Sequence, residues 1–119
     1  MIKPMAIGLS CLSLAVLAIA APAPALALEP VVKVLAEDAA TQVLDVTEAP
    51  GSVGAMSKRT GNIIYVLNGG TFERTYADGT KETTPRKTGD AAIITEKRAY
   101  SVKNVGTTTI HLIEVIKKK

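Results

Sequence analysis

The chain has 119 residues, a formal net charge of +3 and few aromatic side chains, only 3% of the total. Fourteen Lys and Arg residues face eleven Asp and Glu residues, and four of the basic ones are Lys3 and the terminal run Lys117–Lys119. The rest of the chain is near neutral and has no basic stripe, so nucleic acid is excluded as the expected partner. The terminal lysines are interpreted as a solvated end, with an electrostatic tether to an acidic partner or lipid head groups as the alternative.

Residues 1–27 have the regions of a secretory signal peptide in the expected order. Lys3 forms a positive start, residues 5–20 are almost wholly apolar, and the Ala/Pro-rich stretch 21–27 offers small residues at a cleavage site. A membrane anchor is the alternative, but the apolar run is shorter than the roughly 20 residues that a span requires. Lipidation at Cys11 is disfavoured, because the apolar run continues well past this residue.

Cleavage after Ala27 would leave residues 28–119 as a single domain, periplasmic or secreted, with no membrane span. No cysteine would remain, so no disulfide is expected. A dimer is expected to help such a small core.

The rest of the chain predicts strands and no helix. About eight or nine short strands, separated by turn residues, predict an all-β sandwich or barrel. The main runs lie at 31–35, 41–47, 62–67, 72–77, 80–84, 91–95, 99–105 and 108–116.

The clearest local signal is Asp78-Gly79 between two alternating runs, which predicts a hairpin with a type I′ turn. Pro85 and Gly89-Asp90 are expected to break the chain before the next strand. Gly69 and Gly70 are interpreted as turn residues.

Two runs, Ile63–Leu67 and Ile110–Ile116, carry large apolar side chains at both odd and even positions. Strands with one face in water alternate instead, so the outer face of these two should be covered. The cover is expected to be either Val31–Leu35 or a second copy of the chain, and a homodimer is favoured.

The spacing of turn and motif residues across residues 31–116 resembles that of the cupin superfamily. The first motif of this superfamily is G-x(5)-H-x-H-x(3,4)-E-x(6)-G. Asn62 precedes Gly69 by the required six residues, and Pro50-Gly51 lies ahead of this motif. The second cupin motif, G-x(5)-P-x-G-x(2)-H-x(3)-N, matches in spacing from Gly89 to Asn104. The resemblance implies a small cupin-type, jelly-roll-like β-barrel.

The metal ligands of that pattern are replaced. The resemblance places the two first-motif histidines on Met56 and Lys58, the glutamate on Asn62 and the last histidine on Tyr100. Because Gly51 leaves four residues before Met56 where the motif has five, the alternative register puts the two histidines on Ser57 and Arg59. The second motif has also lost its proline and glycine, at Thr95 and Lys97.

Thioether, ammonium, amide and phenol groups do not suit the Fe, Mn, Ni, Cu or Zn that cupin enzymes hold through imidazole and carboxylate. No metal and no other cofactor is therefore expected. If Lys58 points inward, its ammonium would replace the metal charge, and a pocket of Met56, Lys58, Asn62 and Tyr100 would hold a small anion such as a carboxylate. The favoured alternative is a barrel filled by its own side chains, with Met56 as packing and Lys58 reaching water.

His111, the one histidine of the chain, is interpreted as structural, on a face with Ile113 and Val115. Glu96 and Glu114 are expected to face solvent.

The favoured function is a non-enzymatic, exported cupin-like module that binds a small anionic ligand or a periplasmic protein. A metal-independent isomerase or lyase, with Lys58 or Tyr100 as its acid–base group, is the alternative. A structural subunit that needs only its dimer face is the third hypothesis. Fold alone does not decide among them.

Overall fold

The computed structural model describes residues 28–118, which form eight strands and no helix long and apolar enough for a membrane span. The predicted signal peptide and Cys11 lie outside these residues. The strands are β1 (Val31–Glu37), β2 (Thr41–Glu48), β3 (Ile63–Asn68), β4 (Gly70–Tyr76), β5 (Lys81–Arg86), β6 (Ala91–Ile93), β7 (Tyr100–Asn104) and β8 (Ile110–Lys117). All-β architecture, as predicted, is confirmed.

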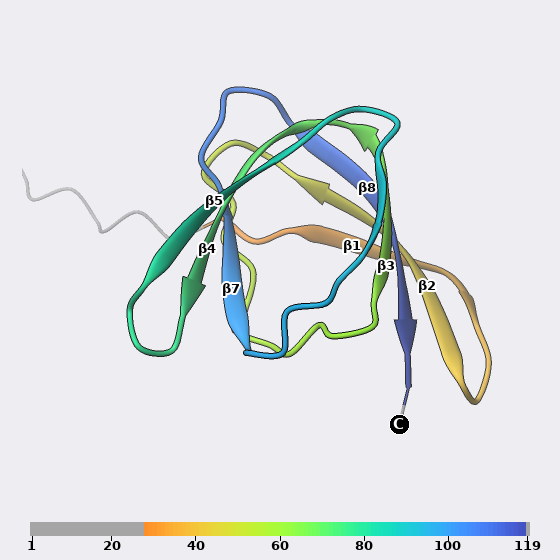
Figure 1. Cartoon of the computed structure of the whole chain (residues 1–119). Helices are drawn as coiled ribbons and strands as arrows, with labels where there is room; N and C mark the ends of the chain where they lie inside the picture. Colours follow the sequence, from red (N-terminus) through yellow and green to blue (C-terminus); the bar gives the residue numbers. More distant parts are fainter. Residues whose placement is uncertain (1–27, 119) are drawn as a thin grey trace, which may run out of the picture.

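The strands form two antiparallel sheets that face each other (Figure 1). One sheet has five strands in the order β1-β2-β8-β3-β6, and the other has three in the order β5-β4-β7. The core joins them, because buried Leu44, Ile64 and Leu112 come from the large sheet and Phe72 and Tyr100 come from the small one. Alternation along the strands sends these side chains inward and their neighbours outward.

The outer face of the large sheet is not covered by the N-terminal strand. β1 pairs with β2 at the sheet edge, and all seven of its residues are exposed. The outward Ile63 and Tyr65 of β3 are 37% and 47% exposed. Of the two covers expected from the sequence, the one formed by Val31–Leu35 is therefore wrong for the described chain.

The hairpin between β4 and β5 has a three-residue loop, not the predicted two-residue type I′ turn. Tyr76 pairs with Thr80, since its backbone N–H donates to the Thr80 carbonyl at 2.9 Å, and Gly79 has a φ of +89°. A three-residue loop takes one residue with positive φ, which glycine supplies without steric cost. Asp78 Oδ1 accepts hydrogen bonds from the Thr80 N–H and hydroxyl, which holds this loop closed.

Pro85 does not end its strand as predicted, because β5 continues to Arg86 with Pro85 opposite Thr71. β5 is an edge strand paired only with β4, and a proline is tolerated where no second strand needs its N–H. This extension places Arg86 within the sheet, close to Gly69. A Cβ on Gly69 would overlap the Arg86 carbonyl oxygen, so glycine permits the close approach of the two chains.

Candidate functional site

The barrel encloses a cavity of about 330 Å³ between the two sheets. Its floor is apolar and is built from inward positions of both sheets. The main floor residues are Leu44, Val46, Ile64, Phe72, Ile94 and Leu112. The volume lies at the small end of the range for ligand pockets, so the interior is not filled by its own side chains.

Three arginine side chains line this cavity: Arg59 from the loop before β3, Arg74 from β4 and Arg86 from the end of β5. The Arg59 and Arg74 guanidinium carbons lie 4.8 and 4.5 Å from the centre of the Tyr100 ring. Such cation–π contacts hold guanidinium groups in place without neutralising their charge.

The loop before β3 is tied to β7, which fixes Arg59. Ser57 and Tyr100 exchange two backbone hydrogen bonds, of 3.1 and 3.0 Å. Two residues later, the Arg59 guanidinium donates to the backbone carbonyls of Ala55, Ser57 and Tyr100. Its partners are uncharged, so its positive charge remains available to the cavity.

Arg86 is half-buried, and its guanidinium makes no hydrogen bond or ion pair within residues 28–118. Burial and then the neighbouring Arg74 charge lower the pKa of Arg86 below its ordinary value. Arg74 has one carboxylate contact, to Glu82 at 3.4 Å. Two neighbouring guanidinium groups with so little neutralisation form a site that an anion would stabilise.

Three carboxyl groups also line the cavity: the exposed Glu29, and Glu48 and Glu114. Glu48 is only 6% exposed, and its carboxyl has no hydrogen-bond partner in the described part of the chain. Burial raises the pKa of Glu48 to about 7, with Arg59 opposing the shift and Glu114 adding to it. Glu114, expected at the surface, instead lines the cavity and accepts a 2.8 Å hydrogen bond from Asn62. Glu114 lies two residues after the inward Leu112 on β8, so its side chain points to the same side of the sheet.

The predicted pocket residues do not all meet. Tyr100 lines the cavity and is 2% exposed, and Asn62 reaches it only through Glu114. Met56 is 46% exposed, and Lys58 lies in a shallow surface hollow beside Arg98. Neither is among the cavity-lining side chains.

Ser57 and Arg59, the two residues named by the alternative register of the first motif, both line the cavity. The five-residue spacing from Gly51 was the signal for this register. Glu48, Arg74 and Arg86 were not predicted as site residues. Strand parity would have found two of them, because Glu48 follows inward Leu44 and Val46, and Arg74 lies between inward Phe72 and Tyr76.

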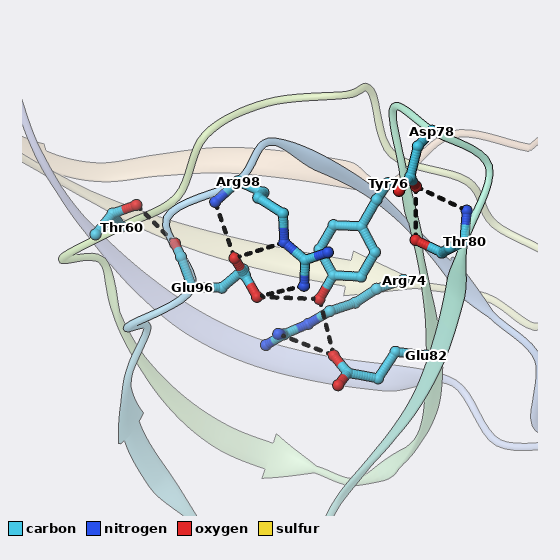
Figure 2. Close-up of polar contacts among 8 residues, drawn as sticks. All are labelled: Thr60, Arg74, Tyr76, Asp78, Thr80, Glu82, Glu96 and Arg98. Atoms are coloured by element: carbon cyan, nitrogen blue, oxygen red, sulfur yellow. Dashed lines mark hydrogen bonds and ion pairs between the residues drawn. The ribbon is translucent and has the colours of Figure 1, made fainter.

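A polar network surrounds Tyr76 and Arg74 near the hairpin between β4 and β5 (Figure 2). The Tyr76 hydroxyl donates to Glu82 at 2.8 Å, and Glu96 lies 3.4 Å from the same hydroxyl. Arg98 lies 3.7 Å from the centre of the Tyr76 ring and pairs with Glu96 at 2.9 Å. The hydrogen bonds from Arg98 lower the pKa of Glu96 to about 2. This network orients the strand that carries Arg74.

His111 lies away from the cavity, on the outer face of β8. Its Nε2 is 2.9 Å from Asp45 Oδ1, on the neighbouring strand β2. This cross-strand pair fits a structural role for the histidine.

The donors around the cavity can be compared with those of a metal centre. Among residues 28–118, no group of three or more His, Cys, Asp or Glu side chains is arranged to hold a metal ion. Three guanidinium groups lie around the space instead, and their charge opposes a cation.

No family model matches the chain, and no curated protein matches it. Solved structures do. A cupin domain from Bordetella pertussis superposes with a TM-score of 0.66 at 15% identity, over 77% of this chain and 96% of that one. A double-stranded β-helix protein from Klebsiella pneumoniae gives 0.59 at 22% identity, over 82% and 81%. A cupin superfamily protein from Desulfitobacterium hafniense gives 0.57 at 14% identity, over 85% and 84%. At such identities the likeness concerns the fold, and this chain has the cupin-type double-stranded β-helix fold.

Proposed function

We propose that this protein is an exported cupin-fold binding module that takes a small organic anion into its barrel without a metal. The observation that carries the proposal is the pair Arg74 and Arg86, two neighbouring guanidinium groups that line one cavity. Arg59 adds a third positive charge from the opposite loop. Carboxylates and phosphates match the planar donor fork of arginine.

The charge of the cavity also supports the metal-free part of the proposal. In the alternative register of the first motif, the histidine positions of the cupin pattern carry Ser57, Arg59 and Tyr100, and all three line the cavity. A guanidinium has no lone pair to donate to a metal and remains protonated in proteins. The anion would therefore bind to the protein's own charges.

Export rests on the pattern of residues 1–27 and places the module in the periplasm or outside the cell. In that location the protein would meet small anions that have entered from the surroundings. A periplasmic protein partner is the other occupant that this location allows.

The protein also assembles as a homodimer under this proposal. Outward side chains of four adjacent strands form a continuous apolar row, Ile93–Ile63–Val115–Val43, which we call the outer row. No charged residue interrupts the outer row, and the His111–Asp45 pair lies at its polar border. A second copy can pair such a row with itself, as a twofold dimer requires.

A second candidate function is metal-independent isomerisation or elimination on a small anionic substrate. Glu48 favours it, because a carboxyl with a pKa of about 7 can both take and return a proton near neutral pH. Tyr100 also lines the cavity, whereas Lys58, the other acid–base group expected from the sequence, does not.

Calorimetric titration of the protein with acetate, butyrate, succinate and phosphate at low ionic strength tests the binding proposal. We expect Arg86→Met to weaken the best anion at least tenfold, because a hydrogen bond to a charged group contributes about 1.5–3 kcal/mol. Lys33→Met is the matched control, since it removes an exposed positive charge on β1. Failure of every anion to bind, or equal effects of the two variants, would overturn the proposal.

A further inference from the structure

Two polar groups that belong to buried residues of the cavity wall have no hydrogen-bond partner in the described chain. The Glu48 carboxyl and the Tyr100 hydroxyl belong to residues that are 6% and 2% exposed, and neither group makes a hydrogen bond within residues 28–118. Other buried polar side chains are bonded: Asn62 donates to Glu114, and Asn104 donates to two backbone carbonyls. Ser52 Oγ is also unpaired, but Ser52 does not line the cavity.

An unpaired carboxyl on a buried residue is costly, so its position requires a physical reason. Arg59 is the cation that acts most strongly on Glu48, yet its guanidinium donates to three backbone carbonyls. Glu48 therefore lies in the electric field of Arg59, but Arg59 donates its hydrogen bonds to other acceptors. The carboxyl remains directed at the cavity, where a ligand group can meet it.

The cavity wall accordingly carries two kinds of polar group over one apolar floor. Arg74 and Arg86 suit a carboxylate, and both act on the Tyr100 phenol, together with Arg59 and Glu114. Burial raises the pKa of Tyr100, which keeps its hydroxyl protonated as a donor to the same anion. Glu48 supplies a second contact for a ligand.

Charge decides what Glu48 accepts. Three arginines face Glu114, the exposed Glu29 and a Glu48 that is about half protonated near neutral pH, so the wall keeps only a small positive excess. The Arg59 charge acts directly on Glu48, and it would repel an ammonium group placed against this carboxyl. An uncharged oxygen meets no such repulsion: a hydroxyl can donate to the Glu48 carboxylate, and a carbonyl can accept from its protonated form.

We infer that the ligand is a small hydroxy or oxo acid, whose carboxylate lies on Arg74 and Arg86 and whose second oxygen hydrogen-bonds to Glu48. This inference rests on the proposed anion-binding function and adds the chemical class of the ligand. A cavity of about 330 Å³ limits the ligand to a small molecule. The apolar floor receives the carbon chain between the two oxygen functions.

The test is a calorimetric comparison of butyrate with its 2-hydroxy, 3-hydroxy, 4-hydroxy, 2-oxo and 2-amino analogues. We expect at least one hydroxy or oxo analogue to bind about tenfold or more tightly than butyrate, and 2-aminobutyrate to bind more weakly than 2-hydroxybutyrate. Glu48→Leu should reduce the preference for oxygen to about twofold or less while butyrate still binds. Glu48→Gln, which keeps a donor and an acceptor, should retain part of the preference.

Tyr100→Phe tests the contact with the carboxylate separately from the contact with Glu48. We expect it to weaken butyrate and the oxygenated analogues by the same factor, so that their ratio is unchanged. Binding of all the analogues with equal affinity would overturn the inference and leave the anion-binding proposal standing. A preference for the oxygenated analogues that remains in a folded Glu48→Leu variant would have the same consequence. Failure of every acid to bind would overturn both, and circular dichroism establishes that each variant is folded.

Discussion

Individual side chains of the cavity show how burial changes chemistry. Glu48 and Glu96 are both glutamates, but their pKa values move in opposite directions, to about 7 and about 2. Glu48 lies in the core without a hydrogen-bond donor, so its charged form is disfavoured. Glu96 accepts hydrogen bonds from Arg98, so its charged form is favoured. The same residue type therefore serves as a ligand-facing acid in one place and as a fixed anion in the other.

The raised pKa of Glu48 predicts a stability that depends on pH. Since the folded state binds this proton more tightly than the unfolded one, the free energy of unfolding should fall between about pH 4.5 and 7, by up to about 3 kcal/mol, and level off above. Arg59 and Glu114 act on this carboxyl most strongly. The other charged residues of the cavity wall are Arg74, Arg86 and the exposed Glu29, and the two arginines should change little in that range.

Urea unfolding of the wild type and of Glu48→Gln across pH 5 to 8 measures this effect. The amide cannot ionise, so the variant should lose the fall in that window and become the more stable protein at pH 8. A parallel pH dependence of the two proteins would contradict the assignment to Glu48.

At the scale of elements, the site depends on two neighbouring chain segments that approach very closely. Gly69 joins β3 to β4 and lies against the end of β5, where there is no space for a side chain. Its N–H donates to Thr88 Oγ1 at 3.0 Å. β5 in turn carries Arg86 into the cavity at its last position. The glycine therefore positions a guanidinium group that lies 17 residues further along the chain.

Gly69→Ala is expected to destabilise the fold by about 1–3 kcal/mol, because the new Cβ would overlap the backbone of Arg86 and Thr88. Gly54→Ala is the control, since its Cβ would meet only ordinary contacts of 3.6 Å or more. Urea denaturation compares the two variants, and equal midpoints would show that the segments separate without cost.

At the scale of the whole molecule, the large sheet has an apolar outer face and a free edge. Tyr65 and Ile93 are 47% and 66% exposed on this face, and β1 is exposed along its length. Exposed apolar patches of this kind mark interaction sites in soluble proteins. The proposed homodimer would bury the outer row and leave the cavity, inside the barrel, unobstructed.

Ile63→Glu places a charge in the middle of the outer row and should convert the dimer into a monomer, because a buried unpaired charge opposes association. Lys33→Glu, on the exposed edge strand, is the control. Analytical ultracentrifugation distinguishes the species, and a wild-type monomer at high concentration would contradict the proposal.

The amino-acid sequence by itself determined the local structure. Alternation and turn residues predicted the strands to within a few residues, because both depend on neighbours in the chain. The cupin-type fold was implied by the resemblance of the motif spacing to the cupin pattern. The same local rules misjudged Pro85, whose tolerance in β5 depends on the absence of a second neighbouring strand.

Tertiary structure decided which side chains share the cavity. Glu48, Arg74 and Arg86 belong to three different strands, and only the closure of two sheets brings them together. In the loop before β3, the residues that line the cavity are Ser57 and Arg59, one position further along the chain than the expected Met56 and Lys58. In the sequence a charged residue in a strand gives no sign of its partners, and whether it is paired in the folded barrel depends on contacts between residues distant in the chain.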